Sequence, residues 1–138
     1  MASRHGTASH DILEQTLRGA RCVEHRGGFL ADGVTGDGCG VLVDIPFDLL
    51  GIRRGEVAVA TLFVLAQSSE RRRALDIFER TFKSRDLEVV GYRRVPVDLS
   101  VLGPMARASR PEIMHAFIAR PAACRTAASF NQQLYLAR

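Results

Sequence analysis

A glycine-dense segment that leads directly into an apolar one constrains the fold of this chain more than any other feature. Half of the chain's 12 glycines lie between residues 27 and 40. Glycine adopts positive φ angles without steric cost and lets the backbone approach another backbone or a ligand closely. We therefore expect residues 27–40 to form a tightly folded loop. The β-branched residues of Cys39–Ile45 predict a strand after it, which Pro46 ends.

Apolar periodicity predicts a mixed pattern of helices and strands around this loop. Ser9 is the expected N-cap of a first helix that ends near Cys22, and Ser68 or Ser69 is the expected N-cap of a second. The segment 56–66 is apolar on both faces, which predicts a central strand. Together with the strand at 39–45, the remaining predicted elements are helices at 68–83 and 122–132 and strands at 87–95, 113–119 and 134–137.

Composition and charge argue against two classes of partner. The net charge is +4, but the arginines are scattered along the chain. The three side chains of the run Arg71–Arg73 would point in different directions around a helix, so we expect the run to be solvated rather than to form a binding patch. The chain has no Trp and two Tyr, too few for a base-stacking platform, so we expect no nucleic-acid partner. The longest apolar run, Val57–Ala66, is much shorter than the roughly 20 residues that cross a bilayer. We expect no membrane partner and, with a polar N-terminus, a cytoplasmic location.

The cysteines and histidines predict no metal site. Cys22, Cys39 and Cys124 form no Cys-x-x-Cys pair and fit a reducing compartment. We expect Cys22 and Cys124 to be packing residues and Cys39 a small, semi-buried side chain. A nucleophilic dyad of Cys39 with His25 is an alternative that sequence alone leaves open. No cysteine cluster or Gly-x-Gly-x-x-Gly motif is present, so no cofactor is expected in this chain.

Several sequence blocks carry a resemblance to a known family. They are, in order, Ser9–Gln15, Glu24–Gly28, Ala31–Asp32, Thr35–Gly38, Val95–Asp98 and Ser100–Pro104, the last with Ala106–Arg107 and Ser109 after it. Together these blocks resemble the class II glutamine amidotransferase (glutaminase) domain of the glutamate synthase large subunit. The resemblance extends over nearly all 138 residues.

The resemblance implies an α+β fold, a partial four-layer αββα sandwich of the N-terminal nucleophile hydrolase type, with residues 1–138 as a single, incomplete domain. It implies release of ammonia from glutamine for glutamate synthesis, with flavin and iron–sulfur chemistry left to a partner. It also implies that residues of the glycine loop are walls of the glutamine pocket rather than catalysts: His25, Arg26, Gly27, Gly28, Thr35, Gly36, Asp37 and Gly38.

The sequence departs from the family pattern at both catalytic elements. Family members begin with a nucleophilic cysteine, whereas this sequence begins Met1–Ser3. Their oxyanion site includes an Asn-Gly pair, whereas Asn131 precedes Gln132. Loss of an oxyanion donor costs about a hundred- to a thousandfold in rate. We therefore expect no catalytic residue here and no glutamine hydrolysis by the chain alone.

Two further functions remain as alternatives to such a module. One is a non-catalytic subunit that binds or regulates a partner amidotransferase, and the other is an unrelated small α/β binding protein. An incomplete sheet leaves unpaired edges and an exposed apolar face. We therefore expect association with another protein chain, such as a glutamate synthase component, or self-association.

Overall fold

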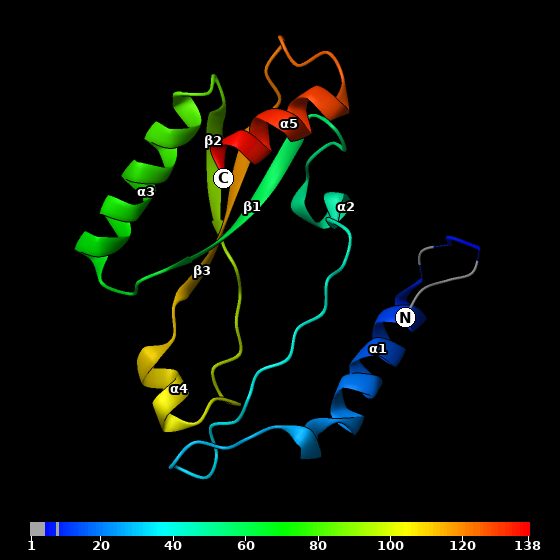
Figure 1. Cartoon of the computed structure of the whole chain (residues 1–138), viewed down its shortest axis with the longest axis vertical. Helices are drawn as coiled ribbons and strands as arrows, with labels where there is room; N and C mark the ends of the chain where they lie inside the picture. Colours follow the sequence, from blue (N-terminus) through cyan, green and yellow to red (C-terminus); the bar gives the residue numbers. More distant parts are fainter. Residues whose placement is uncertain (1–4, 8) are drawn as a thin grey trace. The chain divides into compact units, whose positions relative to one another are not determined.

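The computed structural model of this protein describes residues 5–7 and 9–138 and contains both helices and a small antiparallel sheet (Figure 1). No helix in these residues is long and apolar enough to cross a membrane. In chain order the elements are α1 (His10–Cys22), η1 (Glu24–Arg26), α2 (Phe47–Leu50), β1 (Val57–Val64), α3 (Ser68–Lys83), β2 (Glu88–Arg94), α4 (Pro104–Ser109), β3 (Glu112–Ala119) and α5 (Ala127–Ala137).

The chain divides into two compact units. Unit 1 combines Met1–Asp44 with Leu99–Ser109, and unit 2 combines Ile45–Asp98 with Arg110–Arg138. Unit 1 holds α1, η1, the glycine loop and α4, whereas unit 2 holds the sheet with α2, α3 and α5. The glycine loop therefore shares a unit with a segment from much later in the chain.

The sheet of unit 2 has the order β1-β3-β2, and both neighbours pair antiparallel to β3. His115, in the middle of β3, pairs with Thr61 of β1 and with Arg93 of β2 in the strand register. The strands predicted at 56–66, 87–95 and 113–119 are confirmed with small shifts at their ends. The central position predicted for the first of them is wrong, because β3 occupies it among the described strands.

The hydrophobic core lies on one face of this sheet, under α3 and α5. Ile118 of β3 is 1% exposed and packs with Phe82 of α3 and Phe130 of α5. The same cluster contains Leu87, Cys124 and Ala137, with Ala58, Ala60, Phe78, Val89 and Leu134 packed against it. A groove of about 620 Å³ remains between α3, α5 and β1.

The opposite face of the sheet carries the alternate residues of each strand. Val59 pairs with Phe117 and Phe63 pairs with Ile113, and the Phe63 side chain is 68% exposed. His115 lies on the same face, and its buried Nδ1 atom has no hydrogen-bond partner among the described residues. This face therefore carries Val59, Phe63, Ile113 and Phe117 together with a polar row of Thr61, His115 and Arg93 at its centre.

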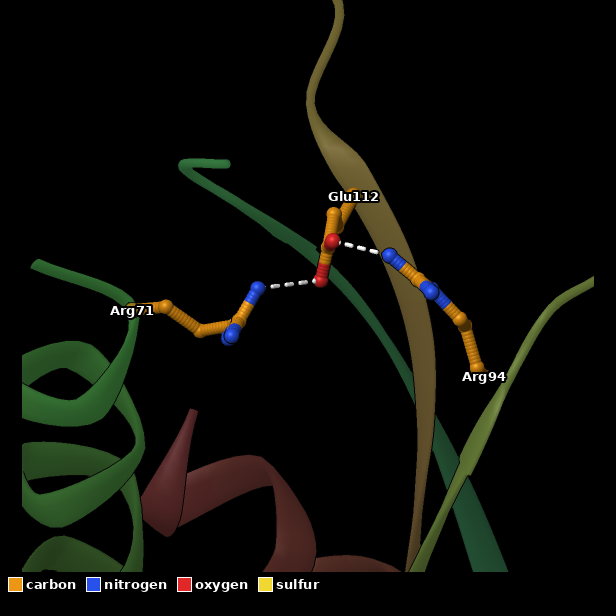
Figure 2. Close-up of polar contacts among 3 residues, drawn as sticks. All are labelled: Arg71, Arg94 and Glu112. Carbon is orange, nitrogen blue, oxygen red and sulfur yellow. Dashed lines mark hydrogen bonds and ion pairs between the residues drawn. The ribbon is translucent and has the colours of Figure 1, made fainter. Parts of the chain in front are cut away.

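An ion-pair cluster joins α3 to the end of the sheet (Figure 2). The Arg71 Nη1 donates to Glu112 Oε2 at 2.6 Å, and the Arg94 guanidinium of β2 donates to the other oxygen of the same carboxylate. Arg72 and Arg73 are exposed, as predicted for a solvated run, but Arg71 is half-buried. The three-arginine run therefore contributes one residue to packing.

The helix boundaries follow the capping chemistry. Ser9 caps α1 by accepting a hydrogen bond from the Asp11 amide, as predicted. The second helix is confirmed as α3, but its N-cap is Gln67, whose side chain makes no capping bond, rather than Ser68 or Ser69. The unpredicted α4 begins with Pro104, a residue favoured at the first helical position.

Two predicted strands are wrong. Residues 134–137 belong to α5, where Phe130, Leu134 and Ala137 recur on one face at helical spacing and pack on the core. Residues 37–46 form no strand, and the Leu42 and Val43 side chains are 100% and 57% exposed. A strand exists only where a neighbour completes its ladder, and no described segment does so here.

We predict that Glu112→Gln lowers the free energy of unfolding by about 1–2 kcal/mol, because it removes the charge shared by two guanidinium groups. Most of this loss should come from the Arg71 pair, since the Arg94 side chain is 73% exposed. Urea unfolding measures it, with Glu56→Gln as a matched control at the exposed Arg53–Glu56 pair. Equal effects of the two substitutions would contradict this assignment.

Candidate functional site

The glycine loop of unit 1 folds back on itself as a short hairpin. Phe29 and Gly36 form an antiparallel bridge, and the Leu30 amide donates to the Thr35 carbonyl at 2.7 Å. One step further out, the Asp37 amide donates to the Gly28 carbonyl at 3.1 Å. The turn contains Gly33, whose φ of 66° lies in the left-handed region that favours glycine. The predicted tight loop is therefore present.

Asp37 closes the base of this hairpin. Its Oδ2 accepts a hydrogen bond from the Gly28 amide at 2.9 Å. A Cβ atom at Gly27 would lie 3.7 Å from the Asp37 Cβ, so these two residues are neighbours as well. The structure thus brings together Gly27, Gly28, Gly36 and Asp37, four of the predicted pocket walls.

The other predicted wall residues lie beside the hairpin in unit 1. His25 and Arg26 are exposed and belong to η1, which Gly27 terminates by donating its amide to the Glu24 carbonyl at 3.0 Å. Gly38 is exposed, and a Cβ atom there would meet no atom within 4 Å. Thr35 differs from the rest because it is buried, at 7% exposure.

The hydroxyl and the amide of the buried Thr35 both donate to Asp32. The Oγ1 to Oδ2 distance is 2.5 Å and the amide N to Oδ1 distance is 2.7 Å. The Val34 amide also donates to Oδ1, at 3.1 Å. The Thr35 hydroxyl, followed by the Thr35 amide, lowers the pKa of Asp32 to about 2. Asp32 therefore stays a carboxylate at a lower pH than an ordinary aspartate does.

The same carboxylate reaches α4. The Met105 amide, in the first turn of that helix, donates to Asp32 Oδ2 at 3.4 Å. Gly103, the residue before α4, lies against Thr35 so closely that a Cβ atom there would be 2.3 Å from Thr35 Oγ1 and 3.0 Å from its amide nitrogen. We call the contact of Asp32, Thr35 and Gly103 the hairpin junction. Sequence reasoning missed the roles of Asp32 and Gly103, although Asp-Gly turns and Pro at a helix start are recognisable signals.

The cysteines show no nucleophilic arrangement among the described residues. No hydrogen bond joins Cys39 to His25, and both side chains are exposed. The semi-buried position predicted for Cys39 and the packing role predicted for Cys22 are wrong, since both are exposed, whereas Cys124 is buried in the core as predicted. No group of three or more potential ligands in the described part could hold a metal ion. Chemically, the surface beside the hairpin can offer a ligand the exposed imidazole of His25 and the exposed guanidinium of Arg26.

Comparison with known proteins identifies the relatives of this chain. The family model of class II glutamine amidotransferases matches residues 1–138. A ferredoxin-dependent glutamate synthase 2 from Synechocystis is 34% identical over all of this chain, which spans 9% of that relative. A chloroplastic ferredoxin-dependent glutamate synthase from Oryza sativa is 30% identical, again over all of this chain and 9% of the relative.

A chloroplastic ferredoxin-dependent glutamate synthase 2 from Arabidopsis thaliana is 33% identical over 86% of this chain and 8% of its own length. The chain thus spans less than a tenth of the length of these relatives. The similarity nevertheless extends over both units, including the glycine hairpin and α4. This chain therefore belongs to the class II glutamine amidotransferases and is a module of that family related to glutamate synthase.

Proposed function

We propose that this module lines a glutamine site whose ammonia serves glutamate synthesis. The observation that carries the proposal is the hairpin, which gathers Gly27, Gly28, Gly36 and Asp37 beside the exposed His25 and Arg26 within a chain that matches the family throughout. The exposed guanidinium of Arg26 suits a ligand that carries a carboxylate, as glutamine does. The similarity to glutamate synthases supports the proposal that the ammonia is used to make glutamate.

We further propose that the chain alone does not hydrolyse glutamine. Covalent amide hydrolysis requires a nucleophile within hydrogen-bond reach of a base. Cys39 has no such partner among the described residues, and Cys124 is buried against the core. The nucleophile and the oxyanion donors would then come from another polypeptide segment. Three free cysteines without a disulfide suit the reducing environment of the cytoplasm, which is the location we propose.

The fold proposal is that unit 2 supplies one half of an αββα sandwich. Helices α3 and α5 would form one helical layer of the sandwich, and the sheet that they cover would form one sheet layer. A second sheet would cover the face that carries Phe63, Val59 and Phe117. Burial of such a face is the main stabilising contribution in stacked sheets.

Residues 37–46 are the proposed contact with a further chain. Their exposed apolar side chains and extended course suit pairing with an incoming strand, which would satisfy the backbone of both segments. A glutamate synthase component or a second copy of this chain would supply that strand. A non-catalytic subunit that regulates a partner amidotransferase remains the second candidate, and the absence of a base beside Cys39 in the described residues favours it.

We predict that Gly38→Ala raises the KM for glutamine about tenfold or more in the glutaminase-active assembly purified through a tag on this chain. A Cβ atom at Gly38 meets nothing within 4 Å, so the fold should tolerate it, and a loss of binding would report substrate at this loop. The matched control is Gly19→Ala in α1, which also meets no atom.

An unchanged KM in Gly38→Ala would show that glutamine does not lie against the loop. The purified 138-residue chain, assayed for ammonia release under the same conditions, should show no activity above background. Activity of the isolated chain would overturn the proposal that the nucleophile lies elsewhere. The assembly is also tested after this chain has been removed. Glutamine binding that is equally tight with and without the chain would favour the regulatory function.

We predict that Val43→Pro weakens association of the chain about tenfold or more, because proline cannot donate to an intermolecular ladder. Val43→Thr, which keeps the amide and the β-branch, should associate as the wild type does. Sedimentation velocity over a range of concentrations, with and without glutamate synthase components from the host, measures both. A wild-type chain that stays a compact monomer in every mixture would contradict the prediction.

A further inference from the structure

The hairpin junction joins two loops that are far apart in the sequence. Met105 follows Asp32 by 73 residues, yet their amide and carboxylate form a hydrogen bond within unit 1. One carboxylate therefore serves both the turn of the hairpin, through Val34 and Thr35, and the first turn of α4. A charged acceptor makes such bonds stronger than a neutral one would.

Steric contact fixes the same two loops. Thr35 is buried against Gly103, and the gap leaves no room for even a methyl group. The Gly103 carbonyl accepts the Arg107 amide at 2.9 Å, and the Arg107 Nη2 donates to the Leu99 carbonyl at 2.7 Å. A shift of α4 would therefore press directly on the backbone of Thr35.

The hairpin backbone connects the hairpin junction to the proposed glutamine-site residues. From Thr35 the path runs through the Leu30 amide to the bridge of Phe29 with Gly36, and then to Gly28 and Asp37. The Leu30 to Thr35 and Asp37 to Gly28 hydrogen bonds flank the Phe29–Gly36 bridge on its two sides, so they couple the base of the hairpin to its tip.

We propose that Asp32, Thr35 and Gly103 are positioning residues that lock the glycine hairpin to α4 and thereby set the geometry of the glutamine-site walls at Gly28 and Asp37. This inference rests on the proposed function for its consequence in catalysis. The lock itself does not depend on glutamine. The three residues act through the hairpin and do not touch substrate.

The first test is amide hydrogen exchange in the full 138-residue chain. Asp32→Asn should increase exchange about tenfold or more at Thr35 and, 73 residues away, at Met105. Asp37→Asn, the control at the base of the hairpin, should increase exchange at Gly28 and leave Met105 protected. Exchange at Met105 that does not respond to Asp32→Asn would overturn the lock.

The same measurement has a pH signature. The pKa of Asp32 is lowered from 3.8 to about 2 in the folded chain, so its charged form stabilises the fold above pH 3.8, and this stabilisation is lost as the pH falls through 2. The ratio of Met105 protection in the wild type to that in Asp32→Asn should therefore be constant above about pH 4 and approach one near pH 2. The other charged side chains on these two elements are Asp37 of the hairpin, which accepts from the Gly28 amide, and Arg107 of α4, which donates to the Leu99 carbonyl. The pKa of Asp32 is lowered by hydrogen bonds from Thr35, Val34 and Met105 and not by either of these charges. A ratio that is independent of pH would contradict a role for the carboxylate charge.

The second test separates positioning from plain stability in the glutaminase-active assembly. Thr35→Val removes the hydroxyl bond to Asp32 at nearly constant volume, whereas Thr35→Ser keeps it. Thr35→Val should raise the KM for glutamine about ten- to a hundredfold with a smaller change in kcat, because a misplaced wall weakens binding, and Thr35→Ser should restore the wild-type value. Thr81→Val on the exposed surface of α3 is the control for a lost threonine hydroxyl.

The outcomes distinguish the inference from the function on which it rests. A wild-type assembly without glutamine turnover overturns the proposed function, while the exchange experiment still decides whether the lock exists. Turnover in the wild type with an unchanged KM in Thr35→Val overturns the positioning role. If Thr35→Val fails to fold, Gly103→Ala in the wild-type chain supplies the steric test, since the added methyl group would meet the Thr35 hydroxyl at 2.3 Å and its backbone at 3.0–3.2 Å. An unchanged KM in that variant overturns the positioning role.

Discussion

The pairing of β3 with both of its neighbours is the interaction on which unit 2 depends. Its backbone groups complete two ladders at once, and its residues Ala116 and Ile118 are 0% and 1% exposed under the helices. Helices α3 and α5 bury their apolar faces on this strand and its neighbours, and Glu112 at its start receives two guanidinium groups. The helical layer has no other surface in the unit on which to form this core.

Unit 1 is organised by a different kind of interaction. Helix α1 has no buried residue, and Thr35 is the one buried polar residue in the described part of the unit. A carboxylate and the contact of a threonine with a glycine take the place of a hydrophobic core there. Polar networks of this kind specify geometry well, because each donor has one partner at one distance. A site that must hold a small polar ligand benefits from that property.

Sequence reasoning located the elements whose signals are local. Ser9 and the breaker Pro96 predicted the start of α1 and the end of β2, and the family resemblance to class II glutamine amidotransferases was confirmed over the whole chain. The errors concern features set by distant partners. Residues 39–45 have strand composition but no described neighbour, and the importance of Asp32 depends on an amide 73 residues away. No window along the chain contains that information.

The contact between Thr35 and Gly103 also limits how this protein can change through single substitutions. Any side chain at residue 103 collides with the threonine backbone as well as its hydroxyl, so shortening Thr35 alone does not make room for it. The two loops must move apart before either position can accept a larger residue. Substitutions at residue 103 are therefore expected only together with compensating substitutions in the turn around residue 33. The two loops should vary together in sequence.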